Sequence, residues 1–157
     1  MENILEDIHE KIEQASGLYY RLVLLVAPAG AGKTAALRKV QTRLAVPLIN
    51  VDLDISRLML ELTTRRRAFQ VAQILEKILR DSDCEVVLFD NLEILFEVSL
   101  KLDPLRLLQG LSRNRTVVAA WNGEIKEHSL TYAAPGHPEY KRYPIRDFLL
   151  VTLKSDS

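Results

Sequence analysis

Apolar residues along this chain follow two patterns, short unbroken runs and wider helical spacings. Unbroken runs of about four to eight apolar residues are typical of strands buried on both faces of a parallel sheet. Apolar residues three and four positions apart are typical of amphipathic helices. The predicted strands cover residues 22–26, 48–52, 85–91, 116–123 and 148–153. The predicted helices cover residues 3–15, 33–44, 54–80 with a break around 63–67, and 105–111.

The order of these elements predicts the fold class. Strands that alternate with helices favour an α/β fold of three layers, in which helices cover both faces of a mostly parallel, five-stranded sheet. Asp54 or Ser56 would cap the long helix, and Pro104 would open the short one. The N-terminal helix carries one apolar stripe, which we expect to cover the sheet of its own chain rather than a neighbouring subunit.

Residues 124–146 do not share this periodicity. They are polar and rich in tyrosine and proline. The sequence therefore predicts a long excursion, irregular or built as a hairpin, whose tyrosines pack against the domain. We expect a single domain over residues 1–157, with residues 1–17 as its N-terminal helix.

Composition narrows the class of protein further. The chain has 157 residues, 48% of them hydrophobic, which is enough for one domain with a substantial core. Lysine plus arginine equal aspartate plus glutamate at 21 each, so net charge neither implies nor excludes nucleic acid. The single cysteine excludes an internal disulfide and suits a reducing compartment. The sequence shows no signal peptide and no membrane-spanning stretch, so we expect a cytoplasmic protein.

The segment after the first predicted strand reads APAGAGKT over residues 27–34. It fits the phosphate-binding pattern G-x-x-x-x-G-K-[ST], except that Ala27 stands in the place of the first glycine. Small residues let a polyphosphate approach backbone N–H groups, and Gly30 and Gly32 can adopt a positive φ freely. The alternative is a small-residue turn with a chance lysine, but the strand before it and the helix after it favour a nucleotide site.

Each part of this loop has a predicted role with ATP and Mg²⁺. Lys33 would reach the β- and γ-phosphates, and the Thr34 hydroxyl would bind Mg²⁺. The start of the following helix would add its dipole and its free N–H groups. The predicted nucleotide-binding residues are Ala29, Gly30, Ala31, Gly32, Lys33, Thr34 and Ala35.

Two later strands end in polar residues that belong at the same edge of a parallel sheet. The run 85–91 contains Asp90 near its end, as a Walker B strand does, where the carboxylate holds Mg²⁺ through its water shell. The run 116–123 contains Asn122 near its end. The alternatives are an aspartate that merely closes a buried strand and an asparagine that begins an Asn-Gly turn.

This succession of elements resembles the additional-strand P-loop ATPases, which include the AAA+ group. The resemblance implies that the fourth strand lies between the loop strand and the Asp90 strand, so that Asn122 faces the γ-phosphate as a sensor. Asn91 departs from the pattern, because many AAA+ proteins carry a glutamate there as the base that activates water. Glu93 is the candidate substitute. No helical lid is expected after the last strand.

Arginines supply two further hypotheses. A cation at the γ-phosphate, often from a neighbouring subunit, assists phosphoryl transfer, and Arg113 is the candidate, with Arg115 and Arg106 as alternatives. A purely structural use of each is the competing interpretation. The triplet 65–67 is interpreted as a solvated helix end or loop, with a phosphate or nucleic-acid contact and a subunit contact as alternatives.

Nearly the whole chain resembles the BrxF family, the small P-loop proteins of type 3 BREX (bacteriophage exclusion) defence systems. The resemblance implies a bacterial, cytoplasmic ATP-binding subunit beside other BREX proteins, among them a DNA methyltransferase and a helicase-like component. We predict an ATPase that assembles with itself or with such partners. A nucleotide-gated scaffold with little hydrolysis and a small-molecule kinase are the alternatives, and DNA binding is an added property that any of these could have. The stretches that carry the resemblance are APAGAGKT, LFDNLEILF, LQGLSRNRTVVAAWNG and APGHPEY.

Overall fold

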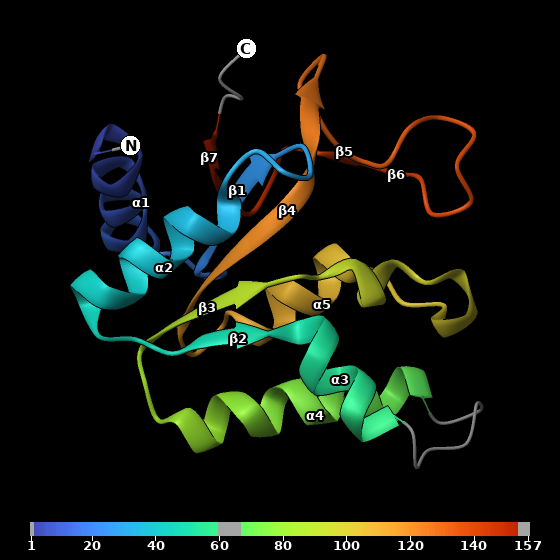
Figure 1. The fold of residues 1–157 in the computed structure, drawn as a ribbon, viewed down its shortest axis with the longest axis horizontal. Coiled ribbons are helices and arrows are strands. Elements are labelled where there is room, and N and C mark those ends of the chain that lie inside the picture. The colour runs from blue at the N-terminus through green and yellow to red at the C-terminus, as the bar shows by residue number, and fades with distance from the viewer. Residues whose placement is uncertain (1, 60–66, 154–157) are drawn as a thin grey trace.

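The computed structural model describes residues 2–59 and 67–153 (Figure 1). No helix among these residues combines the length and apolar character needed to cross a bilayer. The α-helices are α1 (Glu2–Ala15), α2 (Lys33–Leu44), α3 (Val51–Met59), α4 (Arg67–Ser82) and α5 (Pro104–Leu111), and two 3-10 helices are η2 (Glu93–Phe96) and η3 (Val98–Leu100). The strands are β1 (Leu22–Ala27), β2 (Leu48–Asn50), β3 (Val86–Asp90), β4 (Thr116–Lys126), β5 (Ser129–Tyr132), β6 (Lys141–Pro144) and β7 (Leu149–Thr152).

Five strands form a parallel sheet in the order β2-β3-β4-β1-β7 (Figure 1). The strand β4 therefore lies between β1 and β3, as the sequence resemblance implied. Two more strands extend the sheet in antiparallel fashion, β5 beside β4 and β6 beside β5. The prediction of five strands was wrong by these two, because both come from the segment predicted as an excursion.

Helices cover both faces of the parallel sheet. Every residue of β1 is buried, and alternate side chains of that strand point to opposite faces. Val23 and Leu25 pack with α1 and α2, whereas Leu22 and Leu24 pack with α3, α4, α5 and η2. The molecule is thus an α/β protein with a mostly parallel sheet, as predicted.

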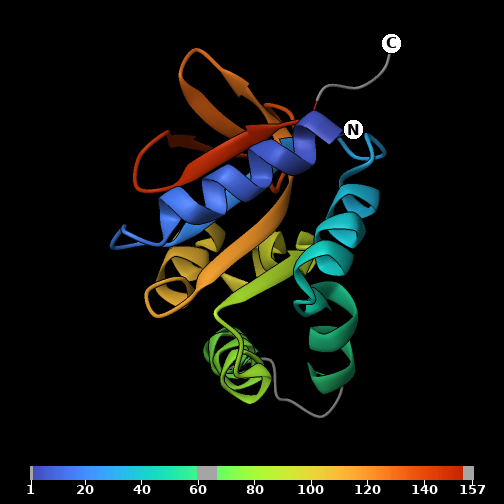
Figure 2. The same cartoon turned by 90° about the vertical axis from the view of Figure 1, so that its left-hand side faces the viewer.

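The N-terminal helix α1 covers its own sheet. It lies along β1 and β7 (Figure 2). Its apolar stripe of Leu5, Ile8, Ile12 and Ala15 is buried against that face, which confirms the predicted use of the stripe.

The region after β2 differs from the prediction. Helix α3 begins at Val51, three residues before the earliest predicted cap, and the Asn50 side-chain oxygen accepts a hydrogen bond from the N–H of Leu53 at 3.1 Å. Asp54 and Ser56 both lie inside α3, so neither is its cap. The chain forms two helices, α3 and α4, and the predicted break around residues 63–67 falls almost wholly outside the described residues.

The segment 124–146 begins as a β-hairpin. The strand β4 runs past Asn122 to Lys126, and the chain returns as β5. Asn122 and Gly123 therefore lie within a strand, so the Asn-Gly turn is wrong. A Cβ on Gly123 would lie 1.8 Å from the Thr131 carbonyl oxygen, and the Trp121 indole N–H donates to the same oxygen at 3.0 Å. Only glycine fits this close approach of β4 and β5.

Aromatic side chains fix the hairpin to the body of the domain. Trp121 packs edge-on against Phe96 and Tyr132, with ring centroids 5.1 and 6.1 Å apart. Phe96 and Tyr132 stack face to face. Tyr143 from β6 packs on Trp121 at 5.9 Å. The predicted packing of the tyrosines against the domain is confirmed for Tyr132 and Tyr143.

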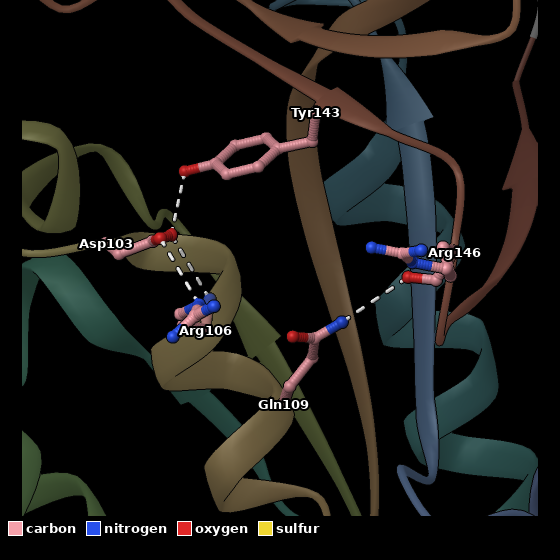
Figure 3. A network of polar contacts seen from close by, with 5 residues as sticks. All are labelled: Asp103, Arg106, Gln109, Tyr143 and Arg146. Atoms are coloured by element: carbon pink, nitrogen blue, oxygen red, sulfur yellow. Dashed lines mark hydrogen bonds and ion pairs between the residues drawn. The ribbon is translucent and has the colours of Figure 1, made fainter.

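Helix α5 holds the chain that returns from the hairpin (Figure 3). The Tyr143 hydroxyl donates to Asp103 Oδ1 at 3.0 Å, and the same carboxylate caps α5. Burial, and then the Asp103 charge, raise the pKa of the Tyr143 hydroxyl, which therefore stays protonated as the donor. The Gln109 amide donates to the backbone carbonyls of Arg146 and Asp147 at 3.5 and 3.3 Å.

Candidate functional site

The strands β1 and β3 end at one edge of the parallel sheet, where β4 passes beside them and continues into the hairpin. Register pairs Ala27, the last residue of β1, with Asn122, and pairs Asn50 with Asp90. The loop that follows β1 leads directly into α2 at this edge. The fold therefore brings together the predicted loop residues 29–35, Asp90 and Asn122.

The loop has the backbone geometry that its glycines predict. Gly30 and Gly32 have φ of 80° and 101°, in the left-handed region that favours glycine. Gly32 directly precedes α2 and offers no side chain to cap it, so the first N–H groups of the helix are available to a ligand. Ala27 closes β1 with a negative φ, so the alanine in place of the first glycine causes no strain.

Lys33 is the buried cation of the site. Its side chain is 6% exposed, and its ammonium donates to the carbonyl oxygens of Ala27 at 2.9 Å and Pro28 at 2.8 Å. Burial lowers the pKa of Lys33, and the nearby Asp90 and Glu93 charges oppose that shift. The charge is therefore fixed against the loop instead of extending into solvent.

Thr34 and Asp90 form a direct pair. The Thr34 hydroxyl donates to Asp90 Oδ2 at 2.6 Å, and the N–H of Asn91 donates to Asp90 Oδ1 at 2.9 Å. Within residues 2–59 and 67–153, no three His, Cys, Asp or Glu side chains group as metal ligands. A cation here would therefore take its remaining ligands from phosphate oxygens and water, which is how Mg²⁺ is usually bound. The hydroxyl and the carboxylate fit that role.

Asn122 contacts Glu93 rather than standing alone. The Asn122 amide donates to Glu93 Oε1 at 2.5 Å, so the candidate sensor holds the candidate base. Asn91 adopts a left-handed conformation, with φ of 55°, and this turn leads the chain from β3 into η2, whose first residue is Glu93. Asn91 and Glu93 both line the site.

Asp52 lies beside the site, in contact with Asn91 and Ile94, and was not predicted from the sequence. Its carboxyl Oδ1 accepts a hydrogen bond from the N–H of Ile94 at 2.7 Å, and its own N–H donates to the carbonyl of Asn91 at 2.9 Å. Burial is the largest cause that raises the pKa of Asp52, to about 7. A hydrogen bond with Glu93 and the charges of Glu93 and Glu97 raise it further, and the hydrogen bond from Ile94 opposes the shift. Its position two residues beyond a strand that ends beside Asp90 was the available signal.

Residues of the loop, α2, β3, β4 and η2 surround one cavity of about 380 Å³, whose lining does not include Asp52. A second cavity, of about 480 Å³, adjoins it and shares Ala29 and Asn122, and the hairpin and the loop 133–139 form its other walls. The lining of the first cavity is Ala29, Gly30, Gly32, Lys33, Thr34, Asp90, Asn91, Glu93, Ala120 and Asn122.

The candidate arginines lie away from this cavity. Arg113 lies between α5 and β4, at the amino ends of the strands and so at the opposite edge of the sheet. Its guanidinium stacks over the Tyr19 ring, 4.4 Å from the centroid. Arg106 pairs with the aspartate that caps α5, and Arg115 donates to the carbonyl of Leu79. A role for Arg113 at the γ-phosphate stays a prediction and requires a second copy of the chain.

The arginine triplet remains untested. Arg65 and Arg66 lie outside the described residues, and Arg67 is described only as the first residue of α4. The solvated helix end or loop, the phosphate or nucleic-acid contact and the subunit contact therefore all stay predictions for this triplet.

Comparisons with known proteins give no family assignment. A scan of protein-family models found no match to this chain, and a search of curated proteins found no significantly similar sequence.

Proposed function

We propose that this chain binds ATP with Mg²⁺ at the edge where β1 and β3 end beside Asn122 of β4, and that it hydrolyses the nucleotide. The observation that carries the proposal is one cavity lined by the buried Lys33 cation, the Thr34–Asp90 pair and the Asn122–Glu93 pair. The position of β4 between β1 and β3 supports a P-loop NTPase fold of the AAA+ type.

Binding follows from complementary charge. The open N-terminus of α2 and the exposed loop residues Ala29 and Gly30 offer N–H groups to a polyphosphate. Lys33 would exchange its two carbonyl contacts for phosphate oxygens. The Thr34 hydroxyl would give up its hydrogen bond to Asp90 and turn its oxygen towards Mg²⁺. The Asp90 carboxylate would then accept hydrogen bonds from the water molecules around Mg²⁺. When bound, Mg²⁺ neutralises phosphate charge and orients the γ-phosphate.

Hydrolysis requires a base, and Glu93 is the best placed carboxylate. A water molecule gives a proton to Glu93, its oxygen bonds to the γ-phosphorus, and the bond from that phosphorus to the β–γ bridging oxygen breaks. ADP and phosphate are the products. The Asn91 amide can orient water but cannot take its proton. Asn122 fixes Glu93 through the 2.5 Å hydrogen bond and lies beside the loop, where it can respond to the γ-phosphate.

The direct test measures nucleotide affinity and MgATP turnover per subunit over a range of protein concentrations. We expect Lys33→Ala to weaken ATP binding by about 10- to 100-fold, because it removes charge-assisted hydrogen bonds to phosphate. Lys39→Ala, which removes an exposed lysine from the same helix, is the matched control and should bind normally. Unchanged ATP affinity in Lys33→Ala would refute the proposed site.

A nucleotide-gated scaffold is the second candidate function. This alternative is favoured by Asn91, which stands where many AAA+ proteins carry the base. It is also favoured by the hydrogen bond that Glu93 Oε1 already accepts from Asn122. Stoichiometric ATP binding without turnover, with and without partners, would select this alternative. Loss of turnover in Glu93→Gln with ATP binding preserved would select hydrolysis, whereas unchanged turnover would remove Glu93 as the base.

The resemblance to the BrxF family supports a place for this activity in bacterial anti-phage defence. The subunit would assemble with itself or with other BREX proteins in the cytoplasm and change its contacts with nucleotide state. Turnover per subunit that rises with protein concentration would indicate a site completed by a second copy. Turnover that is independent of concentration but stimulated by another BREX protein would indicate a partner instead.

A further inference from the structure

The two oxygens of the Glu93 carboxyl have different surroundings. Oε1 accepts the Asn122 amide at 2.5 Å. Oε2 is shielded from water and receives no hydrogen bond from a conventional donor within the described residues. A buried carboxylate oxygen without a donor is costly, so a proton is expected on one of the groups around it.

Asp52 is the neighbour that can supply this proton. The Asp52 N–H donates to the Asn91 carbonyl, and the Asp52 carboxyl accepts the N–H of Ile94, so both bonds hold this residue beside η2, one on each side of Glu93 in the chain. The hydrogen bond from Ile94, the residue after Glu93, holds the Asp52 carboxyl beside the start of η2, and a hydrogen bond with Glu93 is among the causes that raise the pKa of Asp52. Two ionised carboxylates repel and have no hydrogen to share, so a hydrogen bond between them needs one proton.

The surrounding charges assign that proton to Asp52. Lys33 lies close enough to Glu93 for the Glu93 charge to favour the charged lysine. Asp52 faces Glu93 and Glu97, and burial together with these two carboxyl groups raises its pKa to about 7. Burial, and then the charges of Glu93, Glu139 and Asp52, raise the pKa of the Tyr132 hydroxyl to about 12, so it stays neutral.

We propose that Asp52 positions Glu93 by sharing a proton with it, so that the Glu93 carboxyl is held between Asp52 on one side and the Asn122 amide on the other. Asp52 is then a positioning residue that acts through Glu93. The positioning role of Asp52 in catalysis rests on the proposed hydrolysis. The shared proton between Asp52 and Glu93 does not depend on hydrolysis.

The shared proton is tested without nucleotide, by the thermal stability of four proteins from pH 5 to pH 8.5. They are wild type, Asp52→Asn, Glu93→Gln and the double variant. A carboxyl group whose pKa is raised on folding loses its stabilising contribution as pH rises from its unfolded pKa of about 4 to its folded value of about 7. The melting temperature of Asp52→Asn should therefore rise relative to wild type by about 2 °C or more from pH 5 to pH 8.

The Glu93→Gln variant shows how much of the effect of Asp52→Asn on stability comes from the pairing of Asp52 with Glu93. The amide that this substitution introduces would donate to an ionised Asp52, so the gain from Asp52→Asn and its pH dependence should both shrink there, and only the part caused by burial and Glu97 should remain. Asp54→Asn, the same substitution on the same helix, is the matched control against which the Asp52→Asn difference is compared. A flat difference for Asp52→Asn, or one that is the same in both backgrounds, would overturn the proposal.

Turnover supplies the second readout. Asp52→Ala should lower kcat by about tenfold or more while ATP affinity stays unchanged, because it releases Glu93 without touching the phosphate contacts. Asp52→Asn, whose amide can still donate to Glu93, should recover most of that loss and remove the pH dependence of kcat near pH 7. Unchanged kcat in Asp52→Ala would overturn the positioning role. A wild-type protein that shows the stability pattern but no turnover under any condition would refute hydrolysis and leave the shared proton upheld.

Discussion

Replacement of Gly123 by alanine tests the junction between the parallel sheet and the hairpin. The new Cβ would lie 1.8 Å from the Thr131 carbonyl oxygen and 3.0 Å from the carbonyl carbon, where ordinary contacts begin at 3.4 Å. Both atoms belong to the backbone, so β5 must move away from β4 by more than an ångström. That movement also breaks the 3.0 Å bond from the Trp121 indole to the same carbonyl oxygen.

The expected cost is large for a domain of this size. Overpacking costs about 1–3 kcal/mol, and a buried indole N–H without its acceptor costs about 1–3 kcal/mol, which gives roughly 2–6 kcal/mol in all. Urea unfolding followed by the fluorescence of Trp121, the one tryptophan of the chain, measures this directly. Gly110→Ala is the control, because no atom lies within 4 Å of its Cβ position and alanine favours α5 by about 0.5–1 kcal/mol. A Gly123→Ala protein with wild-type stability would refute the close approach of the two strands.

Three further substitutions test separate contacts. Tyr143→Phe should destabilise the fold by about 0.5–1.5 kcal/mol in urea unfolding, because it removes the hydroxyl that donates to Asp103. An unchanged unfolding midpoint would show that this hydrogen bond does not stabilise the fold. Thr34→Val should abolish the tightening of ATP binding by Mg²⁺, measured as affinity with Mg²⁺ against EDTA, and a preserved Mg²⁺ effect would contradict the role of the hydroxyl. Arg113→Ala should leave ATP affinity unchanged and lower turnover at high protein concentration, and normal turnover there would exclude it as a cation donated by a second copy.

The sequence predicted those features that depend on neighbouring residues. The limits of α2 and the positive φ of Gly30 and Gly32 follow from local sterics, because these residue types restrict the backbone wherever they stand. The all-buried β1 follows from its unbroken apolar run. These features alone were enough to bring Lys33 and Thr34 to the edge of the sheet.

Features that depend on distant contacts were not predicted. The strands β5 and β6 are half polar, and their pairing is specified by the contact of Gly123 with Thr131 and by the aromatic packing on Trp121, which no local pattern reveals. The start of α3 was misplaced because the side chain of Asn50, the last residue of β2, caps the helix, whereas aspartate and serine further on have the same capping chemistry. The contact of Asp52 with Glu93 joins residues far apart in sequence, so it required the fold.

The geometry at Asn91 explains why the candidate base lies at Glu93. Asn91 donates its N–H to Asp90 and accepts the N–H of Asp52, and it does so in a left-handed conformation that asparagine adopts more readily than glutamate. A glutamate in its place would therefore carry backbone strain that asparagine largely avoids. The left-handed turn instead starts η2 two residues later, and the first side chain of that helix reaches Asn122. On the proposed function, the asparagine at position 91 and the use of Glu93 as the base have one cause, the left-handed turn of the backbone at Asn91. That turn places the base two residues further along the chain, close to Asp52.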